Sequence, residues 1–131
     1  APTARADTLY GQLRLGGLGL VEAVRNSRLP ATARVLVVVD QFEEIFRFRQ
    51  EGSADEADAF VALLLASAAQ VGFPVYVVLT MRSDFLGDCA LFHGLPEAIN
   101  DGQYLTPRMT REQTRSAIVG PARVARGPGC R

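Results

Sequence analysis

Lysine is absent from this 131-residue chain, and its fourteen basic residues are all arginine. The phosphate-binding motif GxxxxGK[ST] needs a lysine beside its backbone amides, so no such loop lies within these residues. Histidine and cysteine are almost absent as well: His93, Cys89 and Cys130 are isolated in the sequence. Without clustered ligands a histidine- or cysteine-bound metal centre is not indicated, and a single histidine argues against a serine–histidine triad.

Charge of one sign and long apolar runs are also lacking. The formal net charge is zero, which gives no broad basic field for nucleic acid or an anionic membrane. Apolar runs fall far short of the roughly 20 residues that a membrane helix needs, and no signal-peptide pattern opens the chain. With so few cysteines, a reducing setting is the default. We therefore expect a cytoplasmic domain with no nucleic-acid or membrane partner.

The most informative segment present is RVLVVVDQFEEIF, residues 34–46. An uninterrupted apolar run, Val35 to Val39, predicts a strand buried on both faces, as in a parallel sheet. Asp40 follows where that strand ends, at the carboxyl edge where open α/β sheets bind ligands. This is the pattern of a Walker B segment, whose acid holds Mg²⁺ beside a nucleotide. The alternative is an aspartate that only caps the next helix.

A second apolar run, VYVVLT at residues 75–80, predicts another buried strand. Between the two runs, Ser53 and Glu56 form a capping box that opens a helix of about 16 residues. Two strands joined by a helix form a βαβ unit, so the strands should be parallel. The predicted fold class is α/β, with parallel strands at about 35–39 and 75–80 and helices on both faces.

Weaker signals predict the remaining elements. A helix should run from Leu18 until Pro30 stops it, another should start within 42–48, and short helices should lie near 84–90 and 95–100.

Beyond them, Tyr104 and Leu105 could form a short strand. Thr110 and Gln113 form a second capping box, opening a helix to about Val119 that Gly120–Pro121 should close. The aromatic residues expected in the core are Phe42, Phe46, Phe48 and Phe60. Residues 1–7 should be frayed, and residues 126–131 read as a disordered or truncated tail.

Polar residues follow both predicted strands. Parallel neighbours about 4.8 Å apart would bring Asp40 and Arg82 to one edge of the sheet. Asp40 offers a carboxylate suited to Mg²⁺, and Arg82 offers a fixed cationic fork suited to phosphate oxygens. Thr80 should point to the same side as Arg82, so its hydroxyl could also face a bound cofactor. Asp84 could orient Arg82 or cap a short helix, and we favour capping.

Hydrolysis also needs a group that orients or deprotonates water. Gln41, Glu43 and Glu44 are the candidates, although Gln41 could orient water but would be a poor base. Each glutamate could instead simply face solvent on a first helical turn.

Three segments together carry a family resemblance: LVVVDQFEEIF, VYVVLTMRSDFLG and GLPEAINDGQYLTPRMTREQTRSAIVGPA. They closely resemble the novel STAND class of P-loop NTPase domains, regulatory ATPases of bacteria often fused to WD-repeat propellers. The resemblance covers roughly residues 18–125. It implies a partial three-layer P-loop fold of the ASCE type over residues 1–125. It also implies that Asp40 is the Mg²⁺-linked Walker B acid and Arg82 the sensor arginine.

The same resemblance implies ATP and Mg²⁺ as cofactors of the intact parent domain. Its phosphate loop would lie upstream of the helix near Leu18, and winged-helix, WD-repeat or effector segments would lie downstream. The isolated chain should then bind nucleotide weakly or not at all and be inactive. Without the upstream strand, the edge of strand 75–80 would be unpaired, which predicts self-association.

Two other functions compete with a nucleotide-dependent switch. The first is a non-catalytic α/β protein-interaction module in which Asp40 and Arg82 form an ion pair. The second is a self-contained hydrolase that holds a metal with Asp40 and Glu43 or Glu44.

Overall fold

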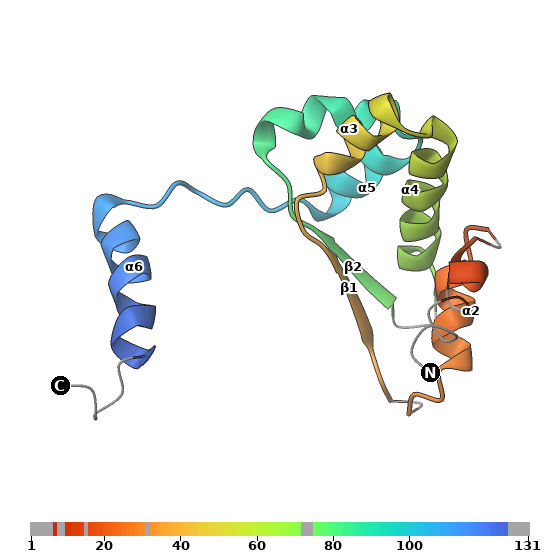
Figure 1. Cartoon of the computed structure of the whole chain (residues 1–131), viewed down its shortest axis with the longest axis horizontal. Coiled ribbons are helices and arrows are strands. Elements are labelled where there is room, and N and C mark those ends of the chain that lie inside the picture. The colour runs from red at the N-terminus through yellow and green to blue at the C-terminus, as the bar shows by residue number, and fades with distance from the viewer. Residues whose placement is uncertain (1–6, 8–9, 15, 31, 72–74, 126–131) are drawn as a thin grey trace.

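The computed structural model describes residues 7, 10–14, 16–30, 32–71 and 75–125. Within them the elements run in the order α2 (Gly19–Asn26), β1 (Val35–Val39), α3 (Glu44–Glu51), α4 (Ala54–Ala68), β2 (Val75–Leu79), the 3-10 segment η1 (Ser83–Leu91), α5 (Leu95–Gly102) and α6 (Arg111–Ala125) (Figure 1). The expected frayed start lies largely outside the described residues, and the expected tail at 126–131 lies wholly outside them.

The two strands are parallel neighbours, which confirms the central prediction. Val35 pairs with Val75 and Val39 pairs with Leu79, so β1 and β2 end side by side. Helix α4 lies between them in the chain and packs against β2. The residues that follow the strands, Asp40 and Thr80, therefore emerge at the same edge of the sheet.

The core lies on one side of the sheet, between the strands and the helices α3, α4 and α5. Its buried members are Phe42, Phe46, Ala57, Val61, Leu64, Cys89, Phe92 and Leu95. Phe46 is at its centre: its ring lies 5.9 Å from those of Phe85 and Phe92 and 6.1 Å from that of Phe42. This aromatic cluster anchors the turn after β1 to the segment after β2.

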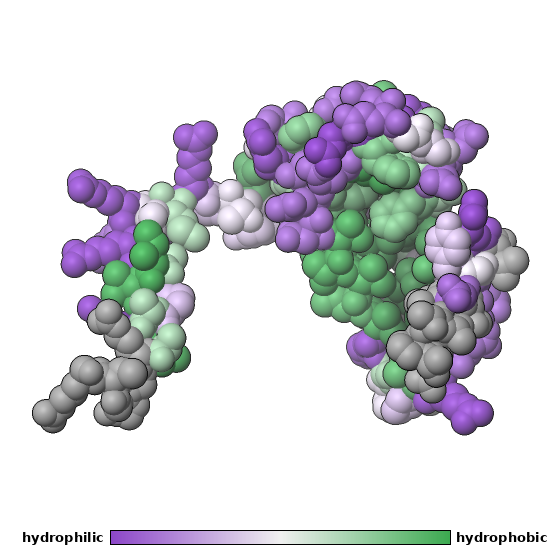
Figure 2. Space-filling view, viewed as in Figure 1, coloured by the Kyte–Doolittle hydropathy of each residue, from purple (hydrophilic) through white to green (hydrophobic). Residues whose placement is uncertain are grey.

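The opposite side of the sheet is open, so the expectation of helices on both faces is wrong for the described part of the chain. Leu36 and Val38 of β1 are 60% and 56% exposed, and Tyr76 and Val78 of β2 are 49% and 45% exposed. Successive side chains of a strand point to opposite faces, and here only alternate residues are covered. Figure 2 shows apolar surface gathered over the strands. A strand made only of apolar residues is compatible with burial of either face. Its sequence therefore cannot show how many faces of the sheet are covered.

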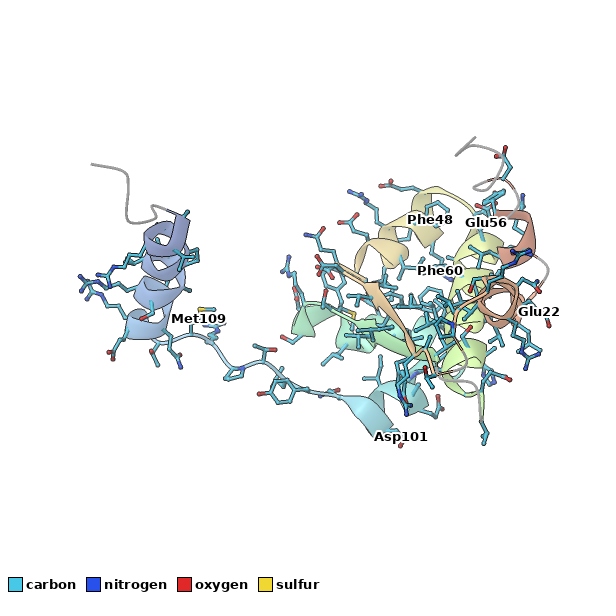
Figure 3. All side chains as sticks on the ribbon, turned by 90° about the horizontal axis from the view of Figure 1, so that it is seen from below. Glu22, Phe48, Glu56, Phe60, Asp101 and Met109 are labelled. Carbon is cyan, nitrogen blue, oxygen red and sulfur yellow. The ribbon has the colours of Figure 1, made fainter. Side chains whose placement is uncertain are left out.

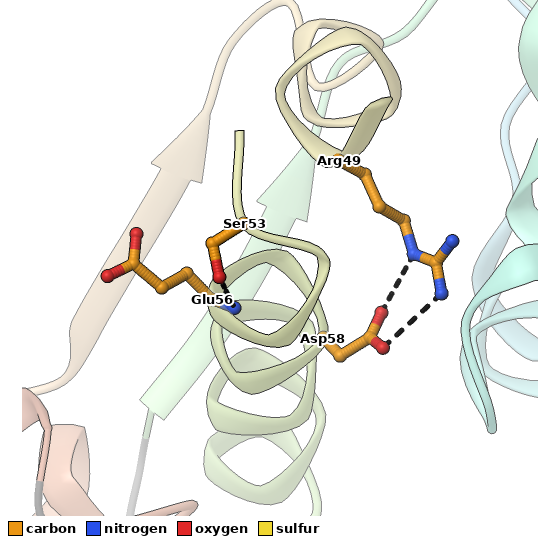
Figure 4. A network of polar contacts seen from close by, with 4 residues as sticks. All are labelled: Arg49, Ser53, Glu56 and Asp58. Atoms are coloured by element: carbon orange, nitrogen blue, oxygen red, sulfur yellow. Dashed lines mark hydrogen bonds and ion pairs between the residues drawn. The ribbon is translucent and has the colours of Figure 1, made fainter. Parts of the chain in front are cut away.

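Polar contacts join helix α3 to helix α4 near the point where one follows the other in the chain (Figure 4). Arg49 donates to both carboxylate oxygens of Asp58, at 3.0 and 3.3 Å. Ser53 caps α4 as expected, its hydroxyl accepting from the Glu56 amide at 3.3 Å. The Glu56 carboxylate, however, forms an ion pair with Arg14, with a nitrogen–oxygen distance of 3.7 Å.

The C-terminal helix α6 lies apart from the other helices, at the end of an extended segment (Figure 1). Its start is as expected, since Thr110 and Gln113 exchange both capping-box hydrogen bonds. Its end is not: α6 continues through Pro121 to Ala125. Gly120 has no Cβ to meet the proline ring, which removes part of the usual clash. None of the residues of α6 is buried, so packing does not hold it in place.

Two further expectations are wrong. Tyr104 and Leu105 form no strand and are 84% and 66% exposed, because no strand of the described part of the chain lies beside them to pair with. Phe48 and Phe60 are 45% and 38% exposed rather than core residues. Figure 3 shows both on the α3–α4 side of the molecule.

Candidate functional site

The candidate site is built on the turn that follows β1. Asp40 and Gln41 are exposed, and Gln41 adopts a left-handed backbone conformation with φ of 54°. Thr80 holds this turn: its hydroxyl donates to Asp40 Oδ1 and accepts from the Gln41 amide at 3.1 Å. The Thr80 carbonyl accepts from the Phe42 amide at 2.9 Å. The carboxyl ends of both strands are thus joined through one residue, and the Asp40 carboxylate has a defined orientation.

Arg82 lies just beyond Thr80 and is engaged by its own segment. Its Nε and Nη2 donate to the two carboxylate oxygens of Asp84 at 3.2 and 2.6 Å, and its guanidinium lies 5.5 Å from the centre of the Phe85 ring. The ion pair with Asp40, expected for an interaction module, is not formed. The capping role favoured for Asp84 is also wrong, because η1 has no side-chain cap and Asp84 orients Arg82 instead.

The three candidates for orienting water are placed differently. Gln41 is exposed in the turn. Glu44 pairs with Arg47 one helical turn later. Glu43 is partly buried, and its Oε2 atom is buried with no hydrogen-bond partner among the described residues. A buried carboxylate oxygen without a partner is costly, so among the three only Glu43 carries an unmet polar requirement.

The donor set bears on which metal sites are possible. The described residues bring together no group of three histidine, cysteine or acidic side chains that could hold a metal ion. A site built from three such protein ligands is therefore not supported among the described residues. Mg²⁺ needs fewer protein ligands, since it keeps several waters and is commonly held by one or two carboxylates and phosphate oxygens. Asp40 fits that role, because a carboxylate that accepts one hydrogen bond still has lone pairs to offer.

The described surface also has a groove. It has a volume of about 720 Å³, runs between α4, β2 and α5, and is bordered by residues 103–106. Its lining is mostly apolar and includes Thr80, whereas Asp40 and Arg82 do not line it. The groove therefore meets the polar edge at Thr80.

Sequence reasoning found the residues of this edge and offered Asp84 as a residue that could orient Arg82, although it favoured capping. That alternative is the one the structure shows. The stacking of Arg82 on Phe85 had no comparable signal.

Within the described residues, no helix is both long and apolar enough to cross a membrane.

Comparison with known proteins gives one finding: the family model of Novel STAND NTPase 1 matches residues 4–128. No curated protein and no solved structure matches the chain. The match spans nearly all of the sequence and includes both strands and the polar edge, so the resemblance seen in the sequence is confirmed. The chain belongs to the Novel STAND NTPase 1 family.

Proposed function

We propose that this chain is part of a regulatory ATP-binding domain that changes conformation with the nucleotide it holds. Family membership implies a nucleotide and Mg²⁺ in the parent domain. The observation that carries the proposal for these residues is the polar edge: Asp40 is oriented by Thr80 at the end of two parallel strands, and Arg82 follows Thr80 by two residues. An acid for the metal next to a cation for phosphate is the arrangement that phosphoryl transfer uses.

Asp40 would take the part of the Walker B acid and hold Mg²⁺ through water. When bound, the ion would neutralise charge on the phosphates. Arg82 would bind the terminal phosphate. Its contacts with Asp84 support this, because they show that the guanidinium can bind two oxygen acceptors at once at 2.6 and 3.2 Å. That two-point geometry suits phosphate oxygens equally well.

Glu43 is the favoured residue for orienting the attacking water, if hydrolysis occurs. Its buried, unpartnered oxygen sets it apart from the exposed Gln41 and from Glu44, which is paired with Arg47. A water molecule within reach of Glu43 Oε2 would satisfy that atom and bring the water into contact with a carboxylate.

The remaining parts of the site would come from the parent chain. The absence of lysine from the whole sequence supports an upstream phosphate loop, because that loop must supply one. The exposed face of β1 and β2 supports a neighbouring segment of the same parent, since apolar sheet faces are normally covered. Downstream winged-helix, WD-repeat or effector segments, and a cytoplasmic setting, belong to the same proposal.

The test is calorimetric binding of ATP and Mg²⁺ to a protein extended upstream through the phosphate loop. Asp40→Ala should weaken the Mg²⁺-dependent part of binding by about tenfold or more, the size seen for a lost charge-assisted contact. Arg82→Ala should reduce the preference for ATP over ADP by a similar factor. The matched controls are Asp101→Ala and Arg115→Ala, exposed residues of α5 and α6.

Controls that weaken binding as much as the site variants would contradict the assigned roles. No binding by a well-folded extended protein would reject the ATPase and favour the interaction module, for which the open sheet face is the supporting observation.

A further inference from the structure

Thr80 makes more contacts with the turn after β1 than the strand pairing requires. Its amide donates to the Val39 carbonyl at 3.0 Å, and its carbonyl accepts from the Phe42 amide at 2.9 Å. The sheet and the turn therefore fix its main chain on both sides. Its hydroxyl, which is carried on this fixed main chain, acts on the two residues in between, Asp40 and Gln41.

Proton accounting gives the direction of the bond to Asp40. A threonine hydroxyl has one proton to donate. The Gln41 amide donates to the Thr80 oxygen, so that contact does not use the hydroxyl proton. An ionised carboxylate can only accept, so the proton lies between Thr80 Oγ1 and Asp40 Oδ1. The Thr80 hydroxyl thus donates its proton to Asp40, the acid that the proposed function assigns to Mg²⁺.

We propose that Thr80 is a positioning residue: its hydroxyl sets the orientation of Asp40 for Mg²⁺, and it does not itself bind the nucleotide. This inference rests on the proposed function of Asp40. It differs from the expectation that the hydroxyl faces a cofactor, and it is supported by the donation of the hydroxyl proton to Asp40. Partners that orient a metal-binding carboxylate typically change metal affinity by about 10–100-fold when they are removed.

The exposure of the site explains why such a partner is needed. Asp40 is exposed and follows the last residue of β1, so packing does not restrain its side chain. Gln41 is held in a left-handed conformation that non-glycine residues seldom adopt. The Thr80 hydroxyl hydrogen-bonds to both residues. It therefore holds the turn and the Asp40 carboxylate in a fixed position relative to the end of β2.

A pair of variants isolates the hydroxyl. Thr80→Val keeps the branched shape and removes the hydroxyl, while Thr80→Ser keeps the hydroxyl and removes a methyl group. Both are made in the protein extended through the phosphate loop. The first measurement needs no nucleotide: hydrogen exchange of individual amides by NMR.

In Thr80→Val the Gln41 amide, which loses its acceptor, should exchange about tenfold faster or more. The Phe42 amide, bonded to the Thr80 carbonyl, should keep its rate, and Thr80→Ser should restore Gln41 to the wild-type rate. Equal acceleration of Gln41 and Phe42 would overturn the inference, because Thr80 would then serve only the general stability of the turn.

The second measurement is ATP binding at a series of Mg²⁺ concentrations, with metal-free ATP as the reference. Thr80→Val should weaken the Mg²⁺-dependent part by about tenfold or more and leave metal-free binding unchanged, with rescue in Thr80→Ser. Weaker metal-free binding would instead mean that the hydroxyl touches the nucleotide, which overturns the positioning role alone. A wild-type protein without any Mg²⁺-dependent ATP binding would overturn the proposed function and this role with it.

Discussion

Cys89 is a residue whose reactivity is set by its surroundings. It is 1% exposed, and its thiol lies 3.9 Å from Met81 Sδ and 3.7 Å from the Phe85 carbonyl. Burial, and to a lesser extent the charge of Asp88, raises the pKa of the Cys89 thiol. In a Cys130→Ser background, we expect iodoacetamide to react with folded Cys89 at least roughly tenfold more slowly than with the same thiol in urea. Mass spectrometry of timed samples would measure both rates.

The pH dependence of Cys89 has a definite sign. Its folded-state pKa is raised, so its contribution to stability is present below the thiol pKa of the unfolded chain, about 8.5, and is lost as pH rises through the folded pKa. Alkylation should accelerate only at higher pH than for a free cysteine. A folded thiol that reacts at neutral pH as fast as the unfolded one would contradict this account.

At the scale of one element, helix α3 offers a matched pair of phenylalanines. Phe46 is 4% exposed and touches three other rings, whereas Phe48 is 45% exposed. Phe46→Ala should lower the free energy of unfolding by about 3–5 kcal/mol, since it leaves a cavity at the centre of the core. Phe48→Ala should cost less than about 1 kcal/mol. Urea denaturation gives both values, and equal losses would show that the core is not centred on Phe46.

The same helix shows how far sequence can predict an element. The pattern at residues 42–48 predicted a helix but placed both Phe46 and Phe48 in the core. Residues two apart on a helix point in nearly opposite directions, so only one of them can face the core. Pro121 is the opposite case: a rule about proline predicted a helix end, yet α6 continues past it. With none of its residues buried, α6 depends on local propensity and capping alone.

At the scale of the whole molecule, the parallel pairing of the strands and the polar edge followed from sequence because both depend on local patterns. What covers the sheet did not, because tertiary packing decides it. The covered face holds Val37 and Val77, while Leu36 and Val38 are equally apolar and stay exposed. The choice of Asp84 rather than Asp40 as the partner of Arg82 is likewise a matter of three-dimensional placement.

The open face of the sheet leads to a prediction for the 131-residue chain in solution. Four exposed apolar side chains lie together there, Leu36, Val38, Tyr76 and Val78, next to strand edges that no other described strand pairs with, and such surfaces associate. We expect sedimentation velocity to show concentration-dependent self-association. Val38→Lys should weaken it by about tenfold or more, because a charge in this patch would have to be desolvated on association. Val71→Lys is the control, since Val71 is 99% exposed and lies outside the strands. Association that persists unchanged in Val38→Lys, or that falls equally in Val71→Lys, would show that contacts other than the sheet face hold the copies together.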